Sequence, residues 1–191
     1  MRSYRPALFA MFVLALFLAL VMAAQAQPAT DKSGKLDQML DALKAAPDER
    51  AAALLEEQVE QAWLQAATPS VTLLMSQGLR LLNAGQNDNA VASFTAAITL
   101  APDMAEAYRQ RAIARYRSGD SAGAVHDLQE TLKLDPRNFA AFRTLSAIAT
   151  ARQDWKSAYA AWQKLLELDP KTPGGETKLK ELKRKAVGEE T

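Results

Sequence analysis

The sequence has no cysteine and a single histidine, His126, among its 191 residues. The absence of cysteine excludes disulfides, thiol nucleophiles, thiolate metal ligands and a lipidated N-terminal cysteine. One imidazole is too few for a zinc or haem site built on histidines. No glycine-rich phosphate loop, nucleophile elbow or metal-ligand spacing occurs in the chain, and those patterns would mark the commonest chemistry. The sequence therefore predicts no catalytic residue, no metal site and no cofactor.

Glycine and proline are scarce, at 8 residues each, whereas apolar residues make up 49 % of the chain. This composition is typical of a helical chain that buries a core. Surplus charge of one sign is also missing, because the formal net charge is only +1. General nucleic-acid binding needs a strong basic surplus, so we do not expect a nucleic-acid partner.

The first 26 residues have the three-part layout of a secretory signal peptide. Arg2 and Arg5 form a short basic start, an unbroken apolar run covers residues 7–21, and Ala24-Gln25-Ala26 fits the small-x-small rule for signal peptidase. We expect cleavage after Ala26 and a mature protein in the periplasm. The alternative is an uncleaved N-terminal membrane anchor, although the apolar run is at or below the length that spans a bilayer. Residues 27–34 are polar and are expected to form a flexible linker.

A repeat of 34 residues follows. It is clearest in the prolines and in two columns of small residues. The prolines are Pro102, Pro136 and Pro170; one small column is Gly78, Ala112 and Ser146; the other is Ala90, Ala124 and Ala158. This period predicts pairs of antiparallel helices of about 13 residues. Small side chains permit a close crossing within each pair, and proline ends each pair because it cannot continue a helix.

The residues inside the predicted turns support the same division. Gly85 and Gly119 stand where each of the first two pairs needs a left-handed residue at the end of its first helix. Gln153 takes that place in the third pair, which therefore has a weaker cap.

These columns resemble the tetratricopeptide repeat (TPR) family, over residues 71–170. The resemblance implies an all-α, right-handed α-solenoid with repeats at residues 71–104, 105–138 and 139–172. A constant period is specific for this fold, whereas the fold serves many functions.

The flanking segments are predicted to cap the stack. Residues 35–69 contain two amphipathic helical patterns, at 36–45 and 47–67, and are expected to form a degenerate hairpin at the N-terminal end. Residues 173–191 are expected to form a C-terminal capping helix and tail, with the helix over 177–186. Terminal elements of solenoids differ from the repeats because one of their faces meets water.

The middle hairpin carries one specific prediction about side-chain pairing. Arg111 stands in a column that faces the second helix of its own hairpin, so its guanidinium should be at least partly buried. A buried guanidinium needs a carboxylate partner. Asp127 lies near the same level, and the other two hairpins lack both residues. The sequence therefore predicts an Arg111–Asp127 ion pair with a structural role.

In such a stack the first helix of each hairpin lines a concave groove, and residues spaced four and then three apart share one face. The predicted ligand groove comprises Met75, Leu79, Leu82, Arg109, Ile113, Tyr116, Arg143, Ala147 and Thr150. An apolar floor beside Arg109 and Arg143 suits an extended or helical peptide that carries acidic groups. The alternative is a solvated arginine ladder without a ligand.

The sequence thus favours a periplasmic adaptor that binds a protein or peptide. A structural module that forms a homo-oligomer through the ends of the solenoid is the alternative, followed by an enzyme without a recognisable motif. One TPR subfamily clamps a C-terminal carboxylate with Lys and Asn. Here its columns hold Met75, Leu79, Gln110, Ala140 and Thr144, which argues against that function.

Overall fold

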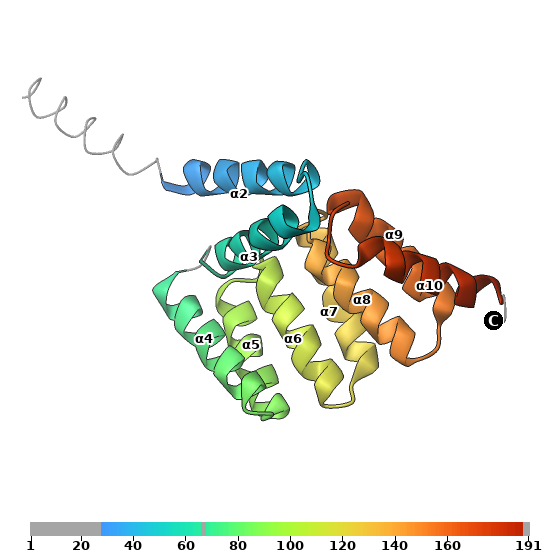
Figure 1. The fold of residues 1–191 in the computed structure, drawn as a ribbon. Coiled ribbons are helices and arrows are strands. Elements are labelled where there is room, and N and C mark those ends of the chain that lie inside the picture. The colour runs from blue at the N-terminus through green and yellow to red at the C-terminus, as the bar shows by residue number, and fades with distance from the viewer. Residues whose placement is uncertain (1–27, 66–67, 189–191) are drawn as a thin grey trace, which may run out of the picture. The chain divides into compact units, whose positions relative to one another are not determined.

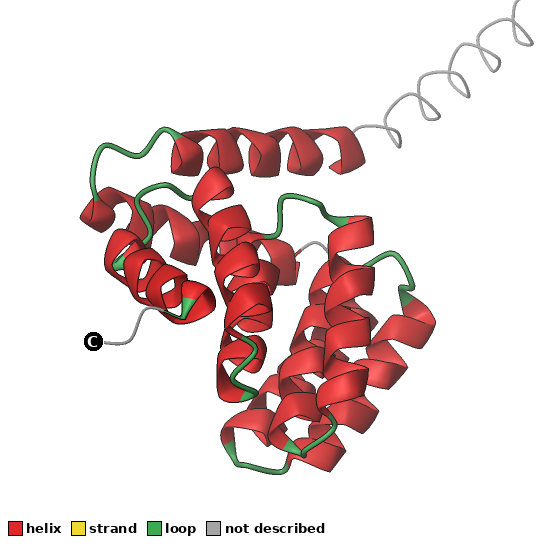
Figure 2. Cartoon of the chain, turned by 90° about the vertical axis from the view of Figure 1, so that its right-hand side faces the viewer, coloured by secondary structure: helices red, strands yellow, loops and turns green. Residues whose placement is uncertain are grey.

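The computed structural model describes residues 28–65 and 68–188, all of whose regular elements are helices (Figures 1 and 2). In chain order they are α2 (Pro28–Lys44), α3 (Glu49–Gln65), α4 (Pro69–Asn83), α5 (Asn87–Leu100), α6 (Ala105–Arg117), α7 (Ser121–Leu134), α8 (Phe139–Ala151), α9 (Trp155–Leu168) and α10 (Gly175–Val187). None of the helices within these ranges has the length and apolarity to cross a membrane. The predicted signal peptide lies outside the described residues.

The chain divides into two compact units, residues 1–38 and 39–191. The second unit contains the end of α2 and all of the later helices. The first contains the beginning of α2, which corrects the flexible linker expected over residues 27–34, because the helix already starts at Pro28. Proline is well suited to a first helical position, where its fixed φ fits and no N–H partner is required. The predicted C-terminal capping segment corresponds to α10.

The three hairpins that the repeat predicts are present. The expected all-α solenoid is therefore confirmed. Helices α4 and α5, α6 and α7, and α8 and α9 pack in pairs, and α10 packs on α9. Each of the last three paired helices starts with a side-chain cap, in which Asp120, Asn138 or Asp154 accepts a hydrogen bond from a backbone N–H three residues later, at 2.8, 2.9 and 3.1 Å. Such caps satisfy N–H groups that a helix start leaves unpaired.

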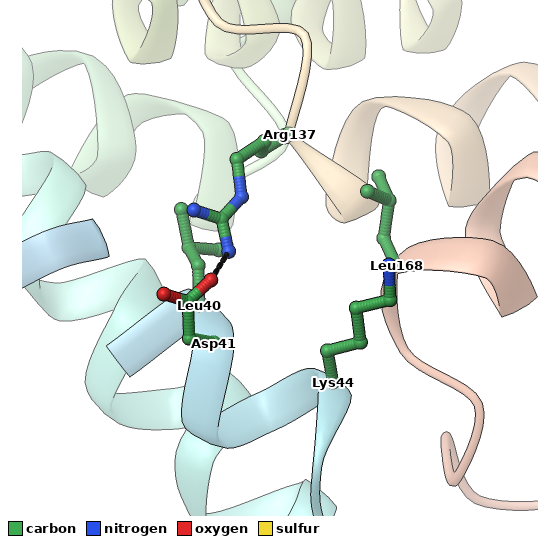
Figure 3. A pocket seen from close by; sticks show the side chains of 5 residues that line it. All are labelled: Leu40, Asp41, Lys44, Arg137 and Leu168. Carbon is green, nitrogen blue, oxygen red and sulfur yellow. Dashed lines mark hydrogen bonds and ion pairs between the residues drawn. The ribbon is translucent and has the colours of Figure 1, made fainter. Parts of the chain in front are cut away.

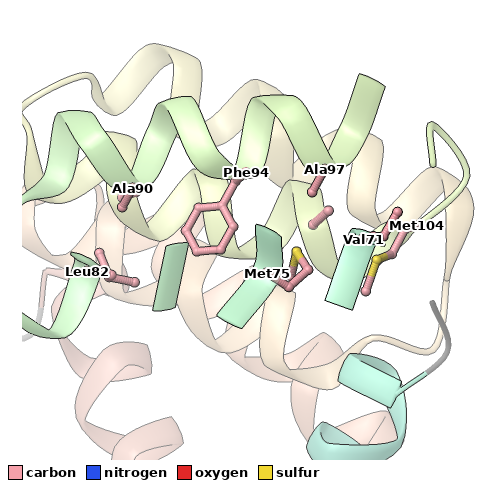
Figure 4. Packing of buried hydrophobic residues seen from close by; sticks show 9 residues of the cluster. Val71, Met75, Leu82, Ala90, Phe94, Ala97 and Met104 are labelled. Atoms are coloured by element: carbon pink, nitrogen blue, oxygen red, sulfur yellow. The ribbon is translucent and has the colours of Figure 1, made fainter. Parts of the chain in front are cut away.

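The small columns mark the close crossings within the hairpins. A Cβ atom on Gly78 would lie only 2.5 Å from the ring of Phe94, which is fully buried. In the third hairpin the Ser146 hydroxyl donates a hydrogen bond of 2.9 Å to the backbone carbonyl of Ala158. Figure 4 shows the equivalent level of the first hairpin, where Ala90 and Phe94 of α5 face α4. The close approach of the two helices is therefore set by the residues that the repeat keeps small.

The turns within the hairpins have the predicted left-handed residue. Gly85 and Gly119 have φ values of 74° and 96°, and Gln153 has a φ value of 57° in the third hairpin. Glycine adopts this region without a steric cost, whereas a residue with a Cβ atom is strained there. The third turn is therefore the least favourable of the three, as the sequence indicates.

Helix α10 covers the last hairpin. Its Leu182 is fully buried, and the indole N–H of Trp162 donates a hydrogen bond of 2.9 Å to the carbonyl of Gly175. The ammonium group of Lys185 lies 4.5 Å from the ring centroid of Trp155, in a cation–π contact. Part of the basic face of α10 thus packs on α9.

Candidate functional site

The candidate site is the surface formed by the first helices of the three hairpins, α4, α6 and α8, which we call the first-helix face. The sequence predicts a ligand groove on this face. In the structure the chain's own helix α3 lies across α8, since Glu56 and Trp63 of α3 contact Arg143 and Phe139 of α8. Helix α3 is also stabilised at its start, where Asp48 accepts a hydrogen bond of 2.8 Å from the backbone N–H of Ala51.

The expectation that residues 35–69 cap the N-terminal end as a degenerate hairpin stays a prediction, because α3 contacts α4 at that end but also reaches α8. Helix α3 contacts α4, and its Leu64 packs against the core of the first hairpin, while Glu56 reaches α8 and the loop that follows α9. The contact with α8 arises from the side chains of α3. Val59 and Trp63 are buried, and the acidic residues beside them find cationic partners on the first-helix face instead of water. The two expected helices also shift, from 36–45 to 28–44 and from 47–67 to 49–65.

Arg143 is the centre of the contact. Its Nη2 atom donates hydrogen bonds to Glu56 Oε1 at 2.6 Å and to Thr172 Oγ1 at 3.0 Å, while Nη1 lies 3.9 Å from Glu60 Oε1. The Thr172 hydroxyl itself donates to Glu56 Oε1 at 2.7 Å. The guanidinium also stands 5.3 Å from the ring centroid of Phe139. These contacts hold Glu56 of α3 in a charge-assisted hydrogen-bond network with Arg143 and Thr172.

A second carboxylate lies next to this network. Asp169 is fully buried, and neither of its carboxylate oxygens accepts a hydrogen bond from the described residues. Its closest cation is Arg143, whose Nη2 atom is 4.0 Å away. Burial, together with the neighbouring Glu56 carboxylate, raises the pKa of Asp169 to about 7. Burial alone would raise the pKa of Glu56 as well, but contacts with Asp169, Thr172 and Arg143 lower it below its usual value.

Arg109, the second predicted basic residue of the groove, has a partner on its own helix. Its Nε and Nη2 atoms donate to the two carboxylate oxygens of Glu106 at 2.8 and 2.7 Å, and Gln110 donates to the same carboxylate at 2.7 Å. Burial alone would lower the pKa of Arg109, but Glu106 and, more weakly, Glu60 raise it. Arg109 is 6 % exposed. Arg109 is therefore a buried member of an ion pair and is not accessible to a ligand.

The predicted apolar floor divides into residues of the core and residues of the surface. Met75 and Leu82 belong to the buried core of the first hairpin, so they cannot line a groove as expected. Both lie in one buried cluster with Ala90, Phe94 and Ala97 of α5. The remaining residues are accessible to different degrees: Ala147 is exposed, and Leu79, Ile113, Tyr116 and Thr150 are partly buried.

The structure has a pocket with a volume of ≈ 280 Å³ (Figure 3). It is lined by Leu40, Asp41, Lys44, Arg137 and Leu168. Arg137 Nη2 donates to Asp41 Oδ1 at 2.6 Å across it. No residue of the predicted groove contributes to this pocket, and no pattern in the sequence predicts it.

The predicted Arg111–Asp127 ion pair is present. Arg111 donates from Nε and Nη2 to the two carboxylate oxygens of Asp127, at 2.9 and 2.8 Å. The Asp127 side chain is fully buried, and Arg115 Nη1 lies 2.9 Å from the same carboxylate. The second arginine was not expected. Its position one turn after Arg111 on α6 is the signal that would have predicted it.

The residues of the site that sequence reasoning missed are Glu56, Thr172 and Asp169. Glu56 stands in a run of glutamates that is typical of a solvated helix face, and Asp169 belongs to the repeated Leu-Asp-Pro phrase. Neither pattern indicates a contact between segments more than 100 positions apart in the chain. Only the negative charge of α3, set against the arginines of the first-helix face, could have indicated their pairing.

Comparison with known proteins places this fold. No protein-family model matches the chain. The chain is 24 % identical over 171 residues to a TPR repeat-containing protein of Rhizobium etli, with 90 % of this chain and 84 % of that protein covered. It is 47 % identical over 58 residues to tetratricopeptide repeat protein 36 of Mus musculus, with 30 % of this chain and 31 % of that protein covered.

Solved structures give the same result. The first TPR of Spaghetti (RPAP3), bound to the HSP90 peptide SRMEEVD, superimposes with a TM-score of 0.59 at 21 % identity and covers 63 % of this chain and 96 % of that one. The Sgt2 TPR domain from Aspergillus fumigatus gives a TM-score of 0.58 at 25 % identity, over 63 % and 81 %. The paired helices, their period and these likenesses define an α-solenoid of helical hairpins. The chain is similar to tetratricopeptide repeat proteins and has the fold of their domains.

Proposed function

We propose that this protein is an adaptor without enzymatic activity that binds a protein or peptide on its first-helix face. One observation carries the proposal: an acidic, amphipathic helix, α3, already lies on this face and is anchored by the 2.6 Å contact of Glu56 with Arg143. The guanidinium of Arg143 and the ring of Phe139 lie one turn apart on α8, and the Thr172 hydroxyl of the loop after α9 lies 3.0 Å from Arg143, so these groups can bind a helical ligand with acidic groups. The first TPR of Spaghetti (RPAP3) was solved with an HSP90 peptide, and the TPR2B domain of yeast Sti1 was solved in a pHsp70 complex. Both support a peptide as the class of ligand.

The signal-peptide pattern of residues 1–26 supports a periplasmic location for the adaptor. In that compartment the lack of cysteine is no handicap, because three stacked hairpins bury a core without disulfides. The partner is therefore expected among envelope proteins.

The proposal is tested by capture from an envelope extract with the full chain immobilised. Arg143→Glu should lose a specific captured protein, because the reversed charge repels the acidic groups that Arg143 holds. Arg184→Glu is the matched control, since Arg184 is exposed on α10. Capture by the unmodified chain should weaken as salt is raised. Equal capture by both variants would show that the first-helix face is not the binding surface.

Self-association is the second candidate, and two exposed side chains favour it. Leu73 on α4 is 65 % exposed and Val187 at the end of α10 is 67 % exposed, so an apolar side chain is open to solvent on the first helix of the repeats and on the helix that follows the last repeat. Such ends can stack between copies of a solenoid. Light scattering across a concentration series distinguishes the candidates, because the adaptor remains a monomer without its partner.

A further inference from the structure

One face of helix α3 carries the apolar and acidic side chains that contact the first-helix face. Ala52, Glu56, Glu60 and Trp63 recur at spacings of four, four and three, so they share a side of the helix. Ala52 is fully buried and Trp63 is 4 % exposed, whereas Glu57, on another side of the helix, is exposed. The sequence of α3 thus combines an apolar stripe with two carboxylates that flank it.

Helix α3 is held by the buried side chains of Ala52, Val59 and Trp63 and by polar contacts at the tips of its longer side chains. Glu56 binds Arg143 and Thr172, and the Trp63 ring lies 5.2 Å from that of Phe139. The two helices of each hairpin, by contrast, approach closely along their backbones. A helix whose backbone approaches its neighbours less closely separates from them at a lower cost than a helix paired within a hairpin.

Two features make the docking of α3 imperfect. The indole N–H of Trp63 is buried and donates no hydrogen bond to the described residues, which costs the free energy of its desolvation. The Glu56 carboxylate stands beside the buried carboxyl group of Asp169, which has no hydrogen-bond donor of its own. Two carboxyl groups in one site oppose each other when both are ionised. An acidic helix whose aromatic residue leaves no buried N–H unpaired avoids the first cost and would bind this surface better than α3 does.

We infer that α3 is a built-in ligand which occupies the first-helix face until another protein displaces it, and that the displacing segment is an acidic amphipathic helix with an aromatic residue. The carboxylates and the aromatic ring of the partner replace Glu56, Glu60 and Trp63. This inference rests on the proposed function and names the ligand class of the same face. The partner is a different protein rather than a second copy, because α3 is tethered to its own face and an identical α3 from another copy gains nothing over it.

The test uses a synthetic, fluorescently labelled peptide of residues 49–65, acetylated and amidated at its ends, as the probe. Its binding is measured by anisotropy on the full chain and on variants in which the internal α3 is weakened. Glu56→Ala removes the acceptor of Arg143, and Trp63→Ala removes the aromatic anchor. Glu57→Ala is the matched control, because it removes the adjacent, exposed glutamate. Far-UV circular dichroism verifies the helix content of each variant, and Glu56→Ala alone carries the test if Trp63→Ala unfolds.

The inference predicts that the probe binds the Glu56→Ala and Trp63→Ala chains at least about tenfold more tightly than the unmodified and Glu57→Ala chains, because less of the face is occupied. A probe that itself carries Glu56→Ala should lose this binding. Equally tight binding to all four chains would overturn the inference but leave the proposed function intact. Absence of binding to every chain, with folding preserved, would overturn both. A wild-type dimer that the probe converts to a monomer would show that a second copy is the occupant.

Discussion

Asp127 is enclosed between two arginines of the facing helix, and Arg111 binds it through both of its carboxylate oxygens, at 2.8 and 2.9 Å. The carboxylate is fully buried, whereas the Arg111 side chain is 12 % exposed. The pair therefore joins α6 to α7 at the level of the small residue Ala124. Because the first and third hairpins hold Ser93 and Ala161 at the position of Asp127, this connection is particular to the middle hairpin.

Removing one partner of this pair should lower the free energy of unfolding more than removing both partners. Asp127→Ala leaves the buried guanidinium of Arg111 without its carboxylate, and such a change costs about 3–5 kcal/mol. Arg111→Leu combined with Asp127→Ala replaces the pair by apolar groups and should cost clearly less. Arg115 tolerates the loss better, since its side chain is 26 % exposed. Urea unfolding of wild type, Asp127→Ala and the double variant gives the order of their free energies of unfolding. A double variant less stable than Asp127→Ala would contradict the prediction.

Overpacking the crossing of the middle hairpin should destabilise the fold. Ala124 is fully buried in the cluster that joins α6, α7 and α8. Ala124→Leu adds three carbon atoms where the helices cross, which should cost about 1–3 kcal/mol. Ala122→Leu is the control, because Ala122 is exposed on the same helix and should leave the denaturation midpoint nearly unchanged. Equal midpoints for wild type and Ala124→Leu would show that the crossing lies elsewhere.

The stability of the site should decrease as the pH rises toward neutrality. Because the pKa of Asp169 is raised from 3.8 to about 7 in the folded protein, the folded state holds a proton that the unfolded state has already lost. The stabilisation from Asp169 is complete below pH 4 and is lost as the pH rises through about 7. Glu56 acts in the opposite sense, since its lowered pKa protects stability above pH 4.5. The window between pH 5 and pH 8 is therefore governed by Asp169.

Asp169→Asn tests this dependence. The amide does not ionise, so at pH 8 the variant should be more stable than wild type by at least about 1 kcal/mol, the equivalent of roughly one pKa unit. The groups around the position are Glu56 and Glu60 on α3 and Arg143 on α8, and none of them changes in the variant. Thermal unfolding from pH 5 to pH 8 gives both curves. A difference that stays constant over this range would rule out the titration of Asp169 as its cause.

Export should leave a mature protein that begins at Gln27. The apolar run and the Ala-Gln-Ala sequence before this residue are the features that signal peptidase requires. Intact mass and N-terminal sequencing of the protein from a periplasmic fraction measure the cleavage. Ala26→Lys, which puts a large charged residue at the cleavage position, should accumulate the uncut precursor. A full-length wild-type chain in the membrane fraction would favour the anchor instead.

The repeat predicted the fold because its columns report directly on packing. The small residues Gly78 and Ala124 fix where helices cross, and the Arg111–Asp127 pair followed from the packing register together with the cost of an unpaired buried charge. These are local relationships within one hairpin. The sequence therefore contains most of the information on how each hairpin closes.

The binding face was predicted less well, for a physical reason. Arg143 stands on the expected face, but its partner Glu56 comes from a helix that the periodicity alone would place in a cap. Arg109 looked like a similar basic group, yet Glu106, three residues before it, neutralises it. Competition between local and distant carboxylates for the same cation depends on geometry, which the pattern of residue types does not contain.

Helix α3 also changes how the chain should fold. A solenoid made only of neighbouring repeats can unfold from its ends, because each unit depends on the next one alone. Here Glu56 and Glu49 bind Thr172 and the backbone N–H of Gly174, so the contacts span 116 and 125 positions of the chain. The segment before the first repeat and the loop after the third are thereby closed into a ring. Loss of either end releases the other, which makes unfolding more cooperative, while the large loop that must close makes folding slower.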